Sequence, residues 1–192
     1  MLSRVRGPIT GWLSRWRSGQ KDALEHIIPL VYDELRQVAR RQLSRESPLH
    51  ALSATALVHE TYLRLLQQRQ LDAHDRSGFL IVAGHTMRRV LVDEARRRRR
   101  LKRGGADAPA AFDEEHEDMG MLADGDMEQV LAVDGLLERL AALDERAVRV
   151  VECRIFAGMT IQETAVALDV SPKTVQRTWM TARAWLRKEL GG

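Results

Sequence analysis

Hydrophobic residues in the first half of the chain recur every three or four positions, which is the spacing of amphipathic α-helices. The pattern predicts four helices, over residues 8–18, 22–44, 53–66 and 78–102. The clearest stripe belongs to the second helix and consists of Leu24, Ile27, Ile28, Val31, Leu35, Val38 and Leu43. Ser53 or Thr55 is expected to cap the third helix, because hydroxyl groups accept from the free N–H groups of a first turn. Four helices of this kind can enclose one hydrophobic core.

The helical period stops at Gly104, and residues 104–128 show no apolar pattern that requires packing. Periodicity resumes at Val130, and Asp144 is well placed to cap a further helix. No strand-like alternation is sustained along the chain. We therefore predict an all-α protein with two small helical domains, residues 1–103 and 129–192, joined by a linker over residues 104–128.

The strongest local signal lies in residues 160–190 and predicts two helices joined by a short turn. Thr160 and Glu163 fit a capping box at the start of the first helix. Ser171 followed by Pro172 gives the second helix a clear beginning, because Ser is favoured as the N-cap and Pro at the first helical position. The arrangement is typical of a helix-turn-helix.

The second of these helices has one face that should be buried and one that should be exposed. The residues expected to face inward are Val170, Val175, Trp179, Ala182 and Leu186. Those expected to face outward in its first turns, where a recognition helix contacts base edges, are Lys173, Thr174, Gln176 and Arg177. Arg, Lys and Gln suit base edges, and Arg183 farther along suits phosphate. An ordinary helical hairpin with a solvated basic face is the alternative.

Three positions decide whether the two helices can pack as such a motif. Ala165 is small enough to let the helices approach closely. Asp169 stands in the turn where glycine is common, and Thr164 stands where a buried aliphatic residue is usual. Neither departure forbids the motif, because Asp tolerates the left-handed backbone region better than most residues.

The distribution of charge is more informative than the formal net charge of +3. Between Arg88 and Arg103, eight Arg and one Lys accompany two acidic residues, a local net charge of +7. Residues 104–128 then carry nine Asp or Glu and no Lys or Arg. The basic stretch predicts phosphate binding. The acidic stretch is either a solvated spacer or a segment that covers the basic stretch in the free protein.

The composition argues against several other classes of protein. The single Cys153 and the six His residues show no metal-ligand spacing, so neither a metal nor a cofactor is expected, and Cys153 should be a core residue. No apolar run approaches a membrane span, which favours a cytoplasmic protein without a membrane partner. The residues that could suggest catalysis are His59, Glu60, His85, Asp93 and Glu94. Because they lack the spacing of a catalytic pair, an enzyme is not expected.

The chain resembles extracytoplasmic-function (ECF, group 4) RNA polymerase sigma factors of the sigma-70 family. In the C-terminal domain the resemblance depends on VSPKTVQRTW followed by ARAWL, which are similar to the fourth conserved region of that family. In the N-terminal domain it depends on PLVYDELRQVARRQL, ALVHETYLRLL and FLIVAGHTMRRVLVDEARRRRR, which are similar in order and spacing to the second conserved region. The matches extend over residues 9–190, with only the linker unmatched.

This resemblance implies a protein that directs core RNA polymerase to promoter DNA and initiates transcription. The recognition helix would bind the minus-thirty-five element, and residues 67–77 would capture a flipped base of the minus-ten element. The fourth helix would contact DNA phosphates through Arg88, Arg89, Arg96, Arg97, Arg98, Arg99 and Arg100. The third helix would dock on the polymerase through Leu57, Val58, Glu60, Leu63 and Arg64, although Leu57 and Val58 could instead be core residues. The acidic linker would suit the basic channels of the polymerase.

One segment departs from this family. Many relatives have acidic residues leading into the docking helix, whereas residues 51–56 carry no negative charge. A phosphate on Thr55 or Ser53 would add negative charge at the helix N-terminus, where the helix dipole favours it. We therefore expect control by a Ser/Thr kinase, with an anti-sigma factor as the alternative partner. Simple capping by Thr55 is the competing interpretation of the hydroxyl.

Two other functions fit parts of the sequence. A stand-alone helix-turn-helix regulator normally binds DNA as a dimer. This chain has no evident dimerisation seam, so the free protein is expected to be a monomer. A general RNA-binding protein that uses the Arg run is the second alternative.

Overall fold

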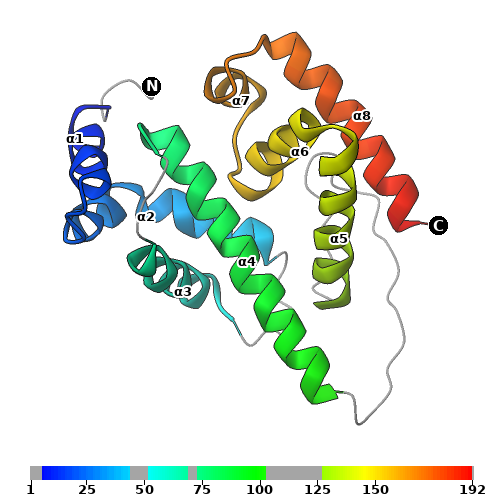
Figure 1. Cartoon of the computed structure of the whole chain (residues 1–192), viewed down its shortest axis with the longest axis horizontal. Coiled ribbons are helices and arrows are strands. Elements are labelled where there is room, and N and C mark those ends of the chain that lie inside the picture. Colours follow the sequence, from blue (N-terminus) through cyan, green and yellow to red (C-terminus); the bar gives the residue numbers. More distant parts are fainter. Residues whose placement is uncertain (1–5, 44–51, 69–72, 103–126, 192) are drawn as a thin grey trace.

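A computed structural model describes residues 6–43, 52–68, 73–102 and 127–191. The elements are α1 (Arg6–Arg17), α2 (Ala23–Gln42), α3 (Ala54–Gln67), α4 (Arg76–Lys102), α5 (Met127–Leu143), α6 (Glu145–Val151), the π-helical η2 (Glu152–Phe156), α7 (Ile161–Ala167) and α8 (Pro172–Leu190). Every element in these ranges is helical, which confirms the all-α prediction. The long helix α4 crosses the middle of the molecule, with α1 and α3 on one side and α5, α6 and α8 on the other (Figure 1).

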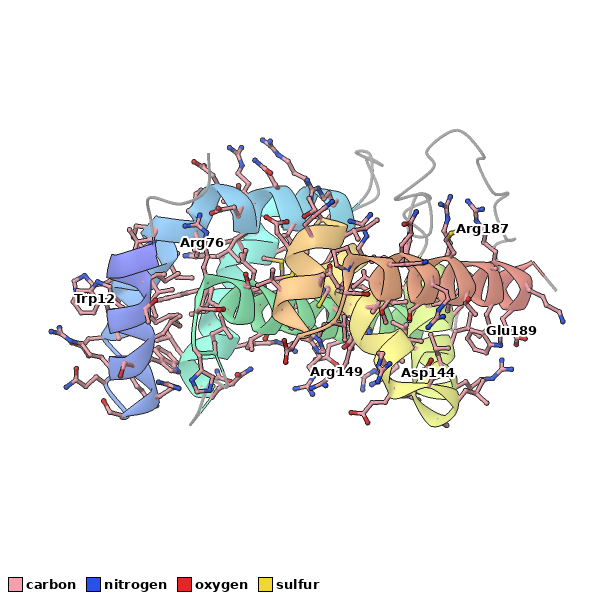
Figure 2. All side chains as sticks on the ribbon, turned by 90° about the horizontal axis from the view of Figure 1, so that it is seen from above. Trp12, Arg76, Asp144, Arg149, Arg187 and Glu189 are labelled. Carbon is pink, nitrogen blue, oxygen red and sulfur yellow. The ribbon has the colours of Figure 1, made fainter. Side chains whose placement is uncertain are left out.

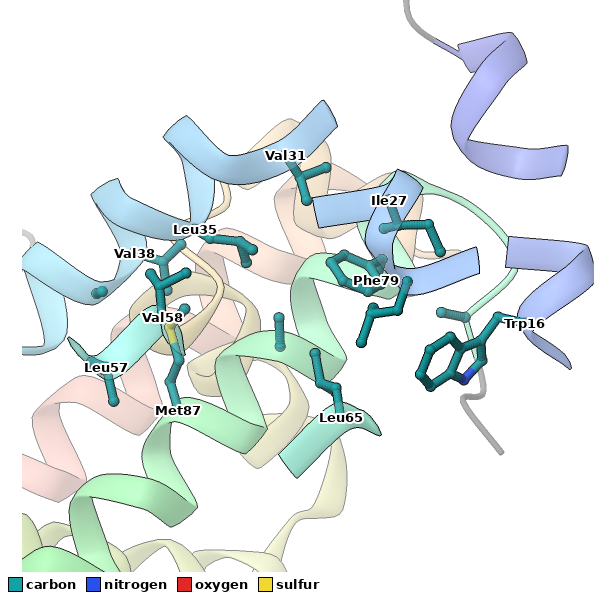
Figure 3. Close-up of a cluster of buried hydrophobic side chains, with 14 of the residues drawn as sticks. Trp16, Ile27, Val31, Leu35, Val38, Leu57, Val58, Leu65, Phe79 and Met87 are labelled. Carbon is teal, nitrogen blue, oxygen red and sulfur yellow. The ribbon is translucent and has the colours of Figure 1, made fainter. Parts of the chain in front are cut away.

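The four helices α1 to α4, which we call the N-terminal domain, share one hydrophobic core, as the apolar spacing predicted. Figure 3 shows Phe79 and Met87 of α4 among apolar side chains of α2 and α3. Trp16 closes the core at α1 and is 2% exposed. Pro29 lies inside α2 and is exposed, and the helix continues through it.

The helices α5 to α8, which we call the C-terminal domain, enclose a second core. Its members include Val133, Leu137, Val151, Val175, Trp179 and Leu186. Cys153 is buried beside Ala157 and Met159, as expected for a core cysteine. Because α8 supplies an apolar stripe to this core, its opposite face is held toward solvent.

The predicted linker needs one correction. Helix α5 begins at Met127, so residues 127 and 128 are helical. Their place in a helix was missed because the first turn of α5 precedes the first apolar residue of the stripe. The remainder of the predicted linker, residues 104–126, lies outside the described residues, as do residues 69–72 of the predicted base-capturing loop.

The two domains are in contact through α4. One side of this helix packs on α2 and α3, and the other packs on α5 and η2, with α7 near its start. The polar and apolar contacts across this boundary decide which of the predicted DNA-binding residues are accessible.

Candidate functional site

Helices α7 and α8 form a tight pair whose ends are fixed by side-chain caps. The Thr160 hydroxyl accepts from the Glu163 backbone N–H at 3.2 Å, and the Glu163 carboxylate accepts from the Thr160 N–H at 2.8 Å. Ser171 caps α8 by accepting from the Thr174 N–H at 3.1 Å, and Pro172 follows at the first helical position. These contacts confirm the caps predicted for both helices.

The turn between α7 and α8 uses a left-handed residue. Asp169 has a φ of 53°, in the region that glycine favours and that Asp tolerates better than most residues. Ala165 is buried at the contact between the helices, as its small size predicted. Thr164 is fully buried, and its hydroxyl has no hydrogen-bond partner among the residues that the structure describes.

Helix α8 presents a largely polar face to solvent. Its buried residues are Val175, Trp179, Ala182 and Leu186. Lys173, Gln176 and Arg177 are exposed on the opposite face, whereas Thr174 and Arg183 are partly buried at its edges. The inward prediction holds for Val175, Trp179, Ala182 and Leu186, and the outward one for Lys173, Gln176 and Arg177. Val170 and Thr174 are intermediate in exposure.

Met180 is a candidate DNA-contacting residue of α8 that the sequence prediction did not include. It is 64% exposed. Its position, seven residues after Lys173 and three after Arg177, places it on the same helical face. The signal in the sequence is this spacing, but an apolar residue in an amphipathic helix is more often a core residue.

The far end of α8 continues this exposed face. Figure 2 shows Arg187 and Glu189 pointing to opposite sides of the helix. Arg187 is exposed, whereas the Glu189 carboxylate pairs with Arg139 of α5 at 2.6 Å. The positive side chain is therefore available for an anion, and the negative one is held against the C-terminal domain.

The predicted DNA-binding arginines of α4 divide into two groups. Arg89 and Arg100 are exposed, and Arg97 is exposed while pairing with Glu94 one turn earlier at 2.7 Å. The side chains of Arg98 and Arg99 lie outside the described residues. Arg88 and Arg96 instead pair with Asp134 of the C-terminal domain, where the Arg88 side chain is 16% exposed and that of Arg96 is still 58% exposed.

The predicted polymerase surface on α3 is smaller than expected. Leu57 and Val58 are 0% and 3% exposed and belong to the N-terminal core, which supports their interpretation as core residues. They face inward because α3 packs against α2 and α4 through this stripe. Glu60 is exposed and Leu63 is 45% exposed. Arg64 is partly exposed and pairs with Asp93 of α4 at 2.6 Å.

The start of α3 distinguishes the two hydroxyl residues proposed as caps. Ser53 is the N-cap and accepts from the Ala56 N–H at 3.1 Å. The interpretation of Thr55 as the cap was wrong, because Thr55 already lies within the helix, where its side chain is exposed. The first turn of α3 contains no acidic residue.

Three of the five residues considered for catalysis, His85, Asp93 and Glu94, have ion-pair partners that explain them structurally. His85 pairs with Glu152 at 3.0 Å, Asp93 with Arg64, and Glu94 with Arg97. Over the ranges that the structure describes, no group of three His, Cys, Asp or Glu could hold a metal ion. No described helix is long and apolar enough to cross a membrane.

A comparison with protein families identifies the chain. The family model for ECF sigma factors matches residues 6–192, so it includes the helices of both domains. No curated protein and no solved structure matches the sequence. ECF sigma factors bind core RNA polymerase and promoter DNA and act in the initiation of transcription. Because the match extends over almost the whole chain and the helical structure agrees with it, the chain belongs to the ECF sigma factor family.

Proposed function

We propose that this sigma factor recognises promoters through two DNA-contacting surfaces, one on α8 and one on α4. The observation that carries the proposal is the exposed polar face of α8, where Lys173, Gln176 and Arg177 follow directly after a capped helix start. A recognition helix inserts this part into the major groove. We assign it to the minus-thirty-five element, with Arg183 near phosphate.

The second surface is the arginine-rich end of α4, which we assign to the minus-ten element. Arg88, Arg89 and residues 96–100 would neutralise phosphates, so binding should weaken steeply as salt increases. Two modest DNA contacts on one chain reinforce each other, because the first raises the effective concentration of the second. The linker over residues 104–126 would connect them through the polymerase.

We assign docking on core polymerase to the exposed side of α3, with Glu60, Leu63 and Arg64 as its contacts. A half-exposed Leu beside an acidic and a basic residue is the composition of an interface with a small apolar centre and a polar rim. Leu57 and Val58 are not part of this docking surface, because their side chains are buried in the N-terminal core.

We further propose that phosphorylation of Thr55 strengthens this docking. Thr55 is exposed in the first turn of α3, and Ser53 already provides the cap, so modification of Thr55 would not remove a capping hydroxyl. A phosphate there adds a charge of about −1.5 to −2 where the helix dipole favours it. Ser53 is the less favourable site, because its hydroxyl oxygen is engaged with the Ala56 N–H.

Run-off transcription with purified core polymerase tests the proposed function. Initiation from specific start sites supports a sigma factor, and the same reaction with Lys173→Ala and Arg177→Ala together should lose that specificity. Specific DNA binding without initiation would indicate a stand-alone regulator. Binding of RNA and DNA alike without initiation would indicate a general nucleic-acid-binding protein.

A separate comparison tests the phosphorylation. Core polymerase is titrated with the unmodified protein, with Thr55→Glu and with Thr55→Ala, and affinity is read from fluorescence anisotropy of a labelled sigma factor. Thr55→Glu should bind more tightly than Thr55→Ala. Equal affinities for the two variants would rule out a charge switch at Thr55 and leave an anti-sigma partner as the remaining form of control.

A further inference from the structure

The backbone of α4 comes unusually close to the C-terminal domain at Gly84. A Cβ atom added to Gly84 would lie 2.5 Å from the carbonyl oxygen of Phe156 and 2.7 Å from its carbonyl carbon. Both are backbone atoms that cannot swing away. The contact therefore requires glycine at this position and defines a single close packing of the two domains.

Hydrogen bonds from α2 secure the same contact. Gln42 donates through Nε2 to the Phe156 carbonyl at 2.8 Å and lies 3.4 Å from the Gly84 carbonyl. Arg41 donates to the Gly158 carbonyl at 3.0 Å. Gln42 is 3% exposed, so its bonds are shielded from water. Charged and uncharged donors of the N-terminal domain thus hold the loop after η2.

An ion-pair network lies next to this backbone contact. Arg88 contacts Asp134 at 2.5 Å and Glu152 at 3.5 Å. Glu152 also pairs with His85 at 3.0 Å, and Arg96 lies 3.4 Å from Asp134. The Arg88 side chain is 16% exposed, and the two carboxylate side chains are 15% and 11% exposed.

In this network carboxylates occupy the positions that phosphates would occupy if Arg88 and Arg96 bound a nucleic acid. A carboxylate and a phosphate both present paired oxygen acceptors to a guanidinium group, and either can be bound by the two N–H edges of Arg. Arg88 also lies over the Phe156 ring at 5.4 Å, so the C-terminal domain occupies both its charged edge and its flat face. DNA cannot reach the buried Arg88 side chain in this packing.

We propose that the C-terminal domain docks on α4 as an intramolecular competitor of DNA. In the free chain Asp134 and Glu152 occupy Arg88 and Arg96, and promoter contact requires the two domains to separate. The inference rests on the proposed function, because it takes these arginines as DNA contacts. It differs from the expectation that the acidic linker covers the Arg run, since the arginines and the carboxylates that occupy them belong to α4, α5 and η2.

The energetics of the contact suit a state that can open. Partly buried ion pairs lose much of their Coulomb attraction to desolvation, so such a network fixes geometry more than it adds stability. The exposed arginines Arg89 and Arg100 remain available for a first encounter with DNA. Polymerase would then complete opening by holding the domains apart.

Gly84→Ala is the most direct test, with Gly135→Ala as the matched control. Both changes place a methyl group in a helix interior, but a Cβ at Gly135 would meet nothing within 4 Å, although it neighbours Asp134. Gly84→Ala should increase the radius of gyration measured by solution X-ray scattering. It should also tighten binding of the free protein to a promoter duplex by about tenfold, a common size for coupling between sites. Gly135→Ala should change neither quantity.

A second pair of variants avoids steric change. Asp134→Asn with Glu152→Gln removes the competing charges, whereas Glu138→Gln with Glu145→Gln removes the same formal charge from exposed positions of the same domain. Only the first pair should reproduce the tighter DNA binding of Gly84→Ala. Equal effects of the two pairs would reduce the inference to general electrostatics and overturn it.

Two readouts separate this inference from the proposed function. If the original chain initiates at specific promoters but Gly84→Ala expands without gaining DNA affinity, the competition is wrong and the sigma activity stands. If neither protein initiates, the proposed function fails, whatever the scattering shows. At saturating sigma factor, Gly84→Ala should give the original run-off yield, because polymerase already holds the domains apart.

Discussion

Gln42 at the end of α2 donates to the backbone carbonyl oxygen of Phe156 at 2.8 Å, across 114 positions of sequence. Phe156 ends the π-helical η2, where Ala157 donates to Glu152 at 2.9 Å over five residues instead of four. Short π-helical segments shift the register of a helix and are frequent where backbone groups serve another purpose. Here the register shift coincides with a carbonyl that faces the N-terminal domain and accepts its hydrogen bond.

Replacing Gln42 with Glu should weaken this contact in a pH-dependent way. Above the pKa of the new carboxyl, its charge faces the carbonyl oxygens of Phe156 and Gly84 and cannot donate, which should cost about 2 kcal/mol or more. Protonation restores a donor, so the cost should shrink as the pH falls toward 5. Urea denaturation at pH 7.5 and pH 5 measures this difference. Gln42→Leu loses a neutral donor only, so its cost should be the same at both pH values.

Thr164→Val should stabilise the protein. The Thr164 side chain is fully buried in α7, and its hydroxyl lacks a hydrogen-bond partner within the described parts of the chain. Replacing the hydroxyl with a methyl group removes this desolvation cost and should raise the free energy of unfolding by about 1 kcal/mol. Thermal unfolding followed by circular dichroism tests it. A lower Tm for Thr164→Val would mean that the hydroxyl does find a partner in solution.

Ser53→Ala and Thr55→Ala should have different effects on stability. Ser53 accepts from the Ala56 N–H, so its loss leaves a donor of the first turn without its cap and should cost about 1 kcal/mol. Thr55 is exposed within α3, and its replacement by Ala should be close to neutral or slightly stabilising. Chemical denaturation of both variants provides the comparison. Equal losses would indicate that the two hydroxyl groups share the capping.

Local features of this fold were predictable from the sequence because their causes are local. The caps at Asp144, Thr160 and Ser171 depend on residues three positions apart, and all three are present. The apolar stripes of α2 and α8 likewise depend on spacing within one helix. Residues brought together by such short-range rules carry their signal in the sequence itself.

The domain contact could not be predicted in the same way. Arg88 and Asp134 are 46 positions apart, and nothing in either segment identifies the other as its partner. The sequence alone gives no reason to distinguish the arginines of α4 from one another. In the structure, however, one face of this helix is covered by the C-terminal domain. The glycine at Gly84 gave no signal either, because its requirement arises from a backbone that approaches from another domain.

Cys153 should be unreactive in the folded protein. Burial raises the pKa of its thiol to about 12, so almost no thiolate is present near neutral pH. A thiol reagent added at pH 8 should react slowly with the native protein and rapidly in denaturant. Because the folded pKa is raised, this group's stabilising contribution is fully present below its ordinary pKa near 9 and is lost as the pH rises toward 12. Cys153→Ala should show less loss of stability over that alkaline range.

Arg177→Ala and Arg187→Ala should separate base recognition from phosphate binding on α8. Arg177 lies in the second turn, where a recognition helix reaches base edges, whereas Arg187 lies three turns farther along the same exposed face. Loss of a base contact costs about 1–3 kcal/mol and relaxes specificity at one position, but loss of a phosphate contact weakens all sequences alike and lowers the salt slope by about 1. Competition among single-base variants of the minus-thirty-five element, repeated at several salt concentrations, distinguishes the two. A reduced salt slope for Arg177→Ala with unchanged base preference would move the base-reading role to Lys173 or Gln176, whose exposed side chains precede it on the same helix.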